Sequence, residues 1–294
     1  MHKSGFVNII GNPNVGKSTL MNALVGEKLS IITSKAQTTR HRILGIVNGD
    51  DFQIVFSDTP GILKPCYKLQ ESMMNFVRGA LSDADVLLYV TDTVERDDER
   101  AAEIIDRIRQ SGVPTLVVVN KIDLTTQEAL EALVEKWRAT LPDAEIIPIS
   151  AREGFNIAGL FDRILALLPE GEPFYPKDTL TDKTLRFFAS EIIREKILRN
   201  YDKEIPYSCE IEIEEYREEP GIDRISAVIY VARNSQKGIL IGRKGAKLKK
   251  VGRQAREELE EFLRKKVFLQ LFVKVSEDWR NDQRQLRRFG YDPQ

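Results

Sequence analysis

The first half of the chain alternates short apolar runs with amphipathic segments. Near-continuous apolar runs at residues 5–10, 86–92 and 114–119 are typical of strands that are buried on both faces of a parallel sheet. Apolar positions at helical spacing lie between them, at residues 69–82 and 97–111. We therefore predict an α/β fold with a doubly wound, mainly parallel sheet, whose ligand lies at the carboxyl ends of the strands.

Two other runs, at residues 43–48 and 52–57, are joined by Gly49-Asp50-Asp51 and predict a β-hairpin. The polar residues 30–42 before the hairpin show little periodicity and predict a mobile loop. The hydrophobic pattern changes after residue 170, where Gly171, Pro173 and Pro176 interrupt helical spacing and predict a linker.

Beyond the linker, helices and strands no longer alternate one by one. The pattern predicts a helix at 182–199, strands at 207–216 and 225–232, helices at 236–241 and 246–265, and a strand at 267–275. This α+β order fits the type II KH arrangement.

A phosphate-binding motif lies between the first apolar run and the first helical pattern. Gly11-x-x-x-x-Gly16-Lys17-Ser18 has Walker A spacing, in which the glycines let successive backbone N–H groups turn inward around phosphate oxygens. Lys17 can reach the β and γ phosphates, and the Ser18 hydroxyl suits Mg²⁺. The nucleotide contacts that we predict here come from Gly11, Asn12, Asn14, Val15, Gly16, Lys17, Ser18 and Thr19.

A second phosphate motif, Asp58-Thr59-Pro60-Gly61, follows the second hairpin strand. Asp58 is placed to hold Mg²⁺ through water, and the Gly61 N–H can meet the γ-phosphate. The same four residues in isolation could form only a β-turn. Their position downstream of a Walker A motif favours the phosphate site.

Guanine specificity is predicted from Asn120-Lys121-Ile122-Asp123, which ends a buried strand. The Asp123 carboxylate can accept two hydrogen bonds from guanine, whereas adenine offers no such pair of donors. Asn120 can tie the loop and reach N7, and the Lys121 stem can lie over the base. Ser150 and Ala151 can supply a backbone N–H to guanine O6. The bland alternative for this motif is a solvated helix N-cap.

Charge separates in the second half. Residues 204–223 hold eight acidic residues and one arginine, whereas residues 233–267 hold twelve Lys or Arg against four Glu. The basic excess surrounds Gly242-Arg243-Lys244-Gly245, a GxxG loop of the kind that clamps a nucleic-acid backbone in KH modules. The predicted RNA contacts are Ile239, Ile241, Gly242, Arg243, Lys244, Gly245, Lys247 and Lys250. The alternative is a solvated basic helix in a purely structural module.

Taken in order, GNPNVGKS, QTTR, DTPG, NKID and SA resemble a Ras-like GTPase domain of the translation-factor-related class. With the GxxG region added, essentially the whole chain resembles the Era-like family of TRAFAC GTPases, which are bacterial ribosome-assembly GTPases with a C-terminal KH domain. The resemblance implies a P-loop GTPase domain at 1–170, a linker at 171–180, and a type II KH domain with a C-terminal extension at 181–294. It also implies that the KH domain binds the 3′ end of small-subunit (16S) ribosomal RNA during assembly of the small ribosomal subunit.

The same resemblance assigns roles in catalysis. Of the two candidate switch threonines, Thr38 and Thr39, it favours Thr39, which joins Ser18 and Asp58 as the expected Mg²⁺ site. Asn14 is expected to help coordinate K⁺, although an Asn there could instead stabilise the turn. The expected catalytic residues are Lys17, Thr39, Gly61 and Asn14.

One departure from Ras-type sites concerns the attacking water. Ile62 stands where a glutamine would orient that water, so we expect slow intrinsic GTP hydrolysis. An alternative hypothesis is therefore an RNA-binding assembly factor that uses GTP only as a structural ligand. A third, an ATP-dependent enzyme, requires that Asp123→Asn leave nucleotide preference unchanged.

Composition adds limits on location and partners. Hydrophobic residues make up 42% and charged residues 30%, which is typical of a soluble globular protein. Cys66 and Cys209 lie far apart with no metal-binding spacing, which suits a reducing compartment. No secretory segment or membrane span is predicted. We expect a cytoplasmic monomer whose contact with the inner membrane, if any, is peripheral. Trp279–Arg288 could extend the RNA surface or pack as a closing turn.

Overall fold

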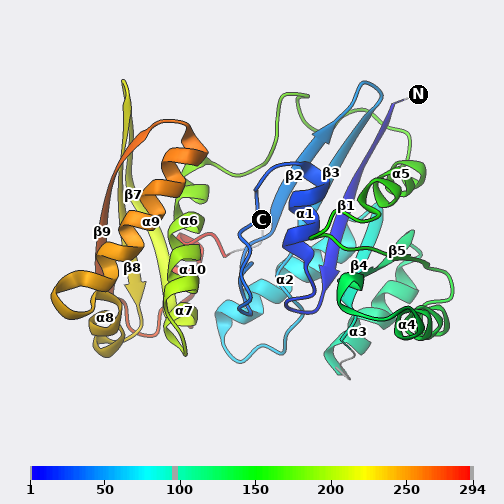
Figure 1. Ribbon diagram of the computed structural model, residues 1–294, viewed down its shortest axis with the longest axis horizontal. Coiled ribbons are helices and arrows are strands. Elements are labelled where there is room, and N and C mark those ends of the chain that lie inside the picture. The colour runs from blue at the N-terminus through cyan, green and yellow to red at the C-terminus, as the bar shows by residue number, and fades with distance from the viewer. Residues whose placement is uncertain (1, 95–98, 292–294) are drawn as a thin grey trace. The chain divides into compact units, whose positions relative to one another are not determined.

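A computed structural model describes residues 2–94 and 99–291 of the 294-residue chain (Figure 1). The chain divides at Asp182 into two compact units, the first formed mainly by the residues before this point and the second mainly by those after it. Each unit has its own sheet and its own apolar core. The predicted order of an α/β unit followed by an α+β unit is confirmed.

A six-stranded sheet forms the centre of the first unit, with strand order β2-β3-β1-β4-β5-β6. Its strands are β1 (Lys3–Gly11), β2 (Ile43–Asn48), β3 (Phe52–Asp58), β4 (Val86–Asp92), β5 (Thr115–Asn120) and β6 (Glu145–Pro148). Strand β2 pairs antiparallel with β3, which confirms the predicted hairpin, and the other neighbours pair parallel. Strands β1, β3, β4 and β5 therefore end at one edge of the sheet, where the predicted motifs begin.

Helices cover both faces of this sheet. They are α1 (Lys17–Val25), α2 (Lys68–Ser82), α3 (Glu99–Ser111), α4 (Gln127–Thr140) and α5 (Ile157–Leu167), with a short 3₁₀ turn at Ile122–Leu124. Apolar residues of α2, α3 and α4 share one buried cluster with β1, β4 and β5. Helix α1 packs with α5 and lies against β1 and β3. The first two residues of the predicted helix at 97–111 lie outside the described residues.

Residues 171–182 pack against the first unit after its last helix. The Gly171 N–H donates to the His2 carbonyl at 3.1 Å, and the Ile46 N–H donates to the Leu180 carbonyl at 2.8 Å. The Phe174 ring lies 4.9 Å from the Phe6 ring, centroid to centroid. This segment thus adds to the edge of the first unit and is ordered by it.

The second unit has a three-stranded sheet in the order β7-β8-β9, with β7 antiparallel and β9 parallel to β8. Its elements are α6 (Leu185–Asn200), α7 (Ile205–Ser208), β7 (Cys209–Glu219), β8 (Ile222–Val231), α8 (Asn234–Ile241), a 3₁₀ turn at Arg243–Gly245, α9 (Ala246–Leu263), β9 (Lys266–Val275) and α10 (Gln283–Arg288). Helices α6, α8 and α9 contribute apolar side chains to one core with the sheet.

Several element boundaries differ from the sequence prediction by a few residues, and two of the differences have a clear local cause. The first strand of this unit begins at Cys209, because Pro206 stands at the start of the short helix α7, where its missing N–H does no harm. Helix α6 begins at Leu185, where the Thr184 hydroxyl accepts a hydrogen bond from the Phe187 N–H as an N-cap.

Candidate functional site

The loop between β1 and α1 has the backbone that a phosphate cradle requires. Gly11 and Gly16 have φ of 150° and 100°. A Cβ at Gly11 would lie 2.1 Å from the Val90 carbonyl oxygen, and one at Gly16 would lie 2.2 Å from the Asn120 side-chain nitrogen. Only glycine fits at either position, so the spacing seen in the sequence follows from close backbone approach.

Lys17 lies at the start of α1 and points back over this loop. Its ammonium donates to the carbonyl oxygens of Gly11 and Asn12, both at 2.9 Å. Burial lowers the pKa of Lys17 from 10.5 to about 8, and the nearby Asp58 carboxylate opposes that shift. A phosphate group beside this ammonium would replace the weak carbonyl partners with a full negative charge.

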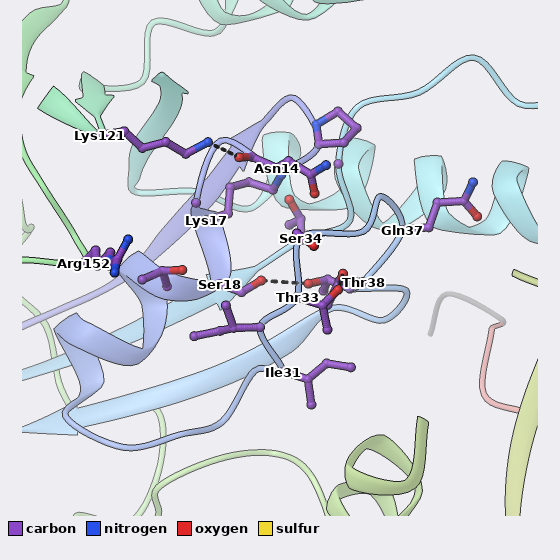
Figure 2. Close-up of a pocket in the computed structure, with 17 residues that line it drawn as sticks. Asn14, Lys17, Ser18, Ile31, Thr33, Ser34, Gln37, Thr38, Lys121 and Arg152 are labelled. Atoms are coloured by element: carbon purple, nitrogen blue, oxygen red, sulfur yellow. Dashed lines mark hydrogen bonds between the residues drawn. The ribbon is translucent and has the colours of Figure 1, made fainter. Parts of the chain in front are cut away.

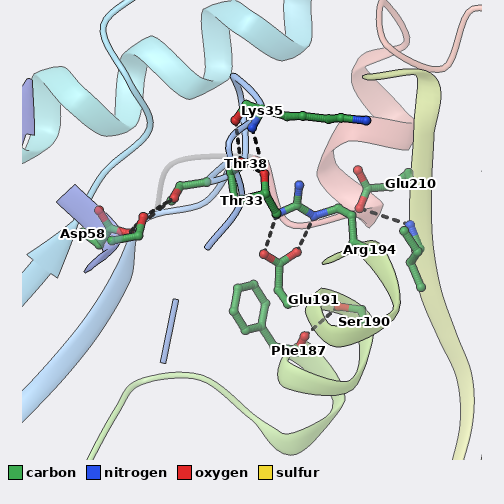
Figure 3. Close-up of polar contacts among 12 residues, drawn as sticks. Thr33, Lys35, Thr38, Asp58, Phe187, Ser190, Glu191, Arg194 and Glu210 are labelled. Carbon is green, nitrogen blue, oxygen red and sulfur yellow. Dashed lines mark hydrogen bonds and ion pairs between the residues drawn. The ribbon is translucent and has the colours of Figure 1, made fainter. Parts of the chain in front are cut away.

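Three oxygen-bearing side chains meet beside the loop. The Ser18 hydroxyl (Figure 2) donates to Asp58 Oδ2 (Figure 3) at 2.7 Å. It also lies 2.8 Å from the Thr39 hydroxyl, which itself donates to Asp58 Oδ2 at 3.3 Å. Asp58 is fully buried, and its Oδ1 has no hydrogen-bond partner among the described residues. Burial raises the pKa of Asp58, which the charge of Lys17 and the hydroxyl hydrogen bonds partly offset. Two hydroxyls and a carboxylate with a spare buried oxygen fit a magnesium ion.

The two candidate switch threonines have different environments. Thr39 is buried and belongs to the group around Asp58. The Thr38 hydroxyl instead donates to the Lys35 carbonyl at 2.6 Å and lies 2.7 Å from the Thr33 hydroxyl, within its own loop. Residues 30–42 have no helix or strand, as predicted for this loop.

Gly61 brings the second phosphate motif against the first. A Cβ on Gly61 would lie 2.8 Å from the Pro13 Cα, and the N–H of the next residue, Ile62, donates to the Gly11 carbonyl at 3.2 Å. The Ile62 side chain is 1% exposed and packs with apolar residues of α2 and α3. It therefore belongs to the core and cannot orient a water molecule.

The base-recognition loop is held by the side chains of Asn120, at the end of β5, and Ser150, just after β6. The Asn120 amide donates to the Val15 carbonyl at 2.9 Å and accepts from the Ala151 N–H at 3.0 Å, so both of its ends are engaged within the protein. The Ser150 hydroxyl donates to Asp123 Oδ1 at 2.7 Å. The Asn120 contacts thus join the P-loop to the Ser150-Ala151 segment, and Asp123 is exposed beside it.

A cleft of about 500 Å³ opens at this edge of the sheet (Figure 2). Of the residues predicted from the sequence, it is lined by Asn14, Gly16, Lys17, Ser18, Thr19, Thr38, Thr39, Gly61 and Lys121. Gly11, Asn12, Val15, Asp58, Asn120, Asp123, Ser150 and Ala151 lie outside this lining. The lining also contains Pro13, Ile31, Ile32, Thr33, Ser34, Gln37, Thr59 and Arg152, which the sequence reasoning missed. The sequence signal that could have placed this loop at the cleft is the apolar pair Ile31-Ile32 within an otherwise polar segment.

The GxxG loop of the second unit joins α8 to α9. Gly242 has φ 69° and ψ 176°, a region that is essentially restricted to glycine, and a Cβ there would lie 2.8 Å from Lys247 Cγ. Lys244 and Gly245 also have positive φ, at 52° and 76°. Ile239 is 43% exposed, while its neighbour Leu240 is buried in the core. The exposed cations around the loop are Arg243, Lys244, Lys247, Lys249 and Lys250.

Tyr201 contacts both helices that flank this loop, and the sequence pattern did not point to this residue. Its hydroxyl donates to the Leu240 carbonyl at 2.6 Å, near the end of α8. Burial raises the pKa of Tyr201 to about 12, with a smaller contribution from the nearby Cys209. The Lys247 ammonium lies 5.7 Å from the centre of the Tyr201 ring. The phenol therefore braces both the helix end and the first turn of α9.

The C-terminal stretch packs on the second unit. The Trp279 indole is fully buried and donates to the Ser208 carbonyl at 3.0 Å. The Tyr291 hydroxyl donates to Glu210 at 2.6 Å, and the Arg288 guanidinium donates to Glu212. Of the two readings left open by the sequence, the closing role therefore has direct support. Among the described helices, none is both long enough and apolar enough to cross a bilayer.

The fold and the site together define a class: a P-loop GTPase domain with a mainly parallel sheet, followed by a KH domain. Residues 6–121 match the family described as 50S ribosome-binding GTPase, and residues 204–280 match the KH domain. Among curated proteins, the GTPase Era of Syntrophus aciditrophicus (strain SB) is 46% identical over 294 residues, covering 99% of this chain and 96% of the relative. The GTPase Era of Alkaliphilus metalliredigens (strain QYMF) is 45% identical over 293 residues and 99% of both chains.

Solved structures agree. A crystal structure of Aquifex aeolicus Era, in a variant form bound to GDP and AlF₄⁻, matches with a TM-score of 0.95 and 43% identity, covering 99% of this chain and 100% of the other. A crystal structure of Era in complex with MgGDPNP and nucleotides 1506–1542 of 16S ribosomal RNA matches with a TM-score of 0.95 and 42% identity over the full length of both chains. The chain belongs to the Era family of GTPases.

Proposed function

We propose that this protein is a GTP-binding and GTP-hydrolysing switch that binds the 3′ end of 16S ribosomal RNA through its KH domain and acts in assembly of the small ribosomal subunit. The observation that carries the nucleotide part is the meeting of Ser18, Thr39 and Asp58 beside the Lys17 ammonium. The RNA part is supported by the glycine-dependent loop with its exposed cations, and by the relative that was solved with a 16S fragment.

The phosphates of GTP would lie against the P-loop N–H groups, with Lys17 neutralising charge on the β and γ groups. When bound, Mg²⁺ supplies charge neutralisation at the phosphate oxygens. Ser18 and Thr39 would hold it directly and Asp58 through water, consistent with the spare buried oxygen of Asp58. The Gly61 N–H would donate to the γ-phosphate in the GTP state and lose that partner after hydrolysis.

Guanine would be selected by Asp123, which can accept from two donors on the base while Ser150 holds its carboxylate. The sequence predicted that Ser150 or Ala151 would donate a backbone N–H to guanine O6, but the Ser150 N–H donates to the Phe155 carbonyl and the Ala151 N–H donates to Asn120. Contact with O6 would therefore require one of these N–H groups to exchange its partner when the nucleotide binds. Thr19 and Val15 complete the cradle through their backbone. This set of donors and acceptors supports GTP over ATP.

Asn14 is exposed at the mouth of the cleft and has φ 64°. We propose that its side chain helps to hold a K⁺ ion close to the β and γ phosphates, in part replacing the arginine that other GTPases use. Because Ile62 is buried in the core, some such external stabilisation is required for turnover. Hydrolysis by the protein alone should be slow.

The RNA backbone would cross the Gly242–Gly245 loop, and the exposed Ile239 with Ile241 would receive unstacked bases. Cations of the loop and of α9 would attract the phosphates. We assign 1–170 to GTP hydrolysis, 171–180 to the connection and 181–294 to RNA binding. Since the proposed partner is the small ribosomal subunit, we place the protein in the cytoplasm as a monomer, with peripheral contact at the inner membrane as a further possibility to be tested by cell fractionation.

The deciding experiment measures binding of a labelled 16S 3′-end RNA to the protein loaded with GDP or with a non-hydrolysable GTP analogue. We expect affinity to depend on the nucleotide and to collapse when Gly242 and Gly245 are changed to Asp. Equal binding in both states would show that the nucleotide does not control the KH domain. Normal binding by the glycine variant would move the RNA site elsewhere.

The second candidate function, an assembly factor that uses GTP only as a structural ligand, is favoured by the burial of Ile62. Steady-state phosphate release, with and without the RNA, separates the two. Turnover that rises with RNA supports the switch. Absent turnover in both conditions, with tight GTP binding, supports the structural ligand.

A further inference from the structure

Asp92 is a buried carboxylate behind the nucleotide cleft to which no sequence motif assigns a role. It is the last residue of β4 and pairs in register with Asn120 of β5. Its side chain is 2% exposed. One carboxylate oxygen accepts from the Val94 N–H at 3.2 Å, and the other accepts from the Lys121 ammonium at 2.8 Å.

The Lys121 ammonium has a second partner in the P-loop. It donates to the Asn14 carbonyl at 2.5 Å (Figure 2). Both Asn14 and Lys121 have φ of 64°, in the left-handed region that is uncommon for residues other than glycine and asparagine. The contact between them therefore joins two left-handed backbone positions, one in each nucleotide-binding loop.

We propose that Asp92 is a positioning residue for guanine-nucleotide binding. Its carboxylate fixes the Lys121 ammonium against Asn14, and so locks the base-recognition loop to the P-loop in the conformation that the nucleotide meets. The Asp92 side chain is almost wholly enclosed, and breaking a buried ion pair by removing one partner is costly, so the contact with the Lys121 ammonium holds that side chain firmly. Without Asp92, the partly exposed lysine would sample other rotamers, and the two loops would lose one of their links, while the Asn120 hydrogen bond to the Val15 carbonyl would remain.

This inference rests on the proposed function, since it names what holds the guanine loop in place. Its test is a double-mutant cycle on GDP dissociation, measured with a fluorescent GDP. Asp92→Asn is close to isosteric and removes the charge. Lys121→Met removes the ammonium but keeps the stem that lies over the base. We expect each single variant to speed GDP dissociation by about tenfold, the effect of losing one charged hydrogen bond.

The combined variant decides the question. If Asp92 acts through Lys121, Asp92→Asn will have little further effect in the Lys121→Met background. A full additional tenfold change there would overturn the proposal, as would unchanged dissociation in a folded Asp92→Asn protein. Glu145→Gln is the matched control. Glu145 lies on β6 of the same sheet and forms an exposed ion pair with Arg163 of α5, so its loss should leave the rate of GDP dissociation unchanged.

Two further measurements keep the outcome clear. If Asp92→Asn folds poorly, Lys121→Arg tests the same link. Because it keeps the cation, the rate of GDP dissociation should stay within a few-fold of the parent rate. A tenfold faster dissociation would count against the charge pair. Asp123→Asn tests the base site itself. If Asp123→Asn leaves the preference for guanine unchanged, the proposed function fails; if it does not, and Asp92→Asn is silent, only the role of Asp92 fails.

Discussion

The hydroxyl groups of Ser18 and Thr39 lie 2.8 Å apart, although the residues are 21 positions apart in the chain. One belongs to the first turn of α1 and the other to a loop without regular structure. Asp58 accepts hydrogen bonds from both. The position of the loop that carries Thr39 is therefore linked to the oxygen atoms that can hold a magnesium ion.

Replacing Thr39 by Ala should lower the apparent Mg²⁺ affinity of the GTP-bound protein by at least about tenfold and slow hydrolysis, because one hard oxygen is lost. Thr38→Ala is the matched control, since its hydroxyl bonds within its own loop. Magnesium titrations of a fluorescent GTP analogue measure both. Equal effects of the two substitutions would show that Thr39 has no special relation to the metal.

Nucleotide affinity should fall as pH rises from 7 to 9. The pKa of Lys17 in the free protein is lowered to about 8 by burial, so the ammonium is increasingly lost over this range, whereas bound phosphates favour the charged form. Calorimetry of GDP binding near pH 8.5 in buffers of different ionisation enthalpy should show proton uptake. Lys17→Met should abolish the uptake along with most of the affinity.

The lowered pKa of Lys17 has the opposite effect on the stability of the nucleotide-free protein, because here a rise in pH favours the folded state. Between pH 8 and 10.5 the unfolded chain binds more protons at Lys17 than the folded chain does. The contribution of Lys17 to the free energy of unfolding therefore rises with pH across this window. Urea unfolding of the parent and of Lys17→Met at pH 7.5 and 9.5 isolates that contribution. A parent that loses stability relative to the variant would contradict the prediction.

Installing a glutamine after the second phosphate motif should not create a fast GTPase. Ile62 is 1% exposed in the core, so Ile62→Gln would bury an amide among apolar side chains. We expect a loss of roughly 2–4 kcal/mol in the free energy of unfolding and no gain in turnover. Ile62→Leu, which conserves volume, should cost less than about 1.5 kcal/mol. A stable Ile62→Gln protein with faster hydrolysis would mean that the side chain leaves the core.

RNA binding should weaken with salt in proportion to the phosphates that the GxxG region contacts. Lys244→Ala and Lys247→Ala should each reduce the slope of log affinity against log salt by about 0.7, the value per phosphate for single strands. Lys266 is also an exposed cation, at the start of β9, and it lies 3.8 Å from the Glu260 carboxylate, so Lys266→Ala should leave the slope unchanged. Fluorescence anisotropy from 50 to 300 mM salt measures all three.

Much of the site followed from local spacing. The Walker A residues lie within eight positions of one another, so the turn and the start of the helix dictate the arrangement of Gly11, Gly16, Lys17 and Ser18. The apolar runs then placed each later motif at the end of a strand. The order of elements in the KH unit also followed from pattern, because its strands and helices are long and strongly periodic. Short features such as α7, which depends on Pro206, gave no periodic signal.

Relations between distant residues were decided only by the tertiary structure. The family resemblance favoured Thr39 over Thr38, and only the loop conformation gives the two hydroxyls different partners. Asp92 gained its role from the parallel pairing of β4 with β5, which no local pattern records. Trp279 is fully buried, and its indole N–H donates to the Ser208 carbonyl, 71 positions earlier in the chain. Spacing along the chain determines which backbone and chemistry a segment can offer, whereas packing determines which of its side chains meet a partner.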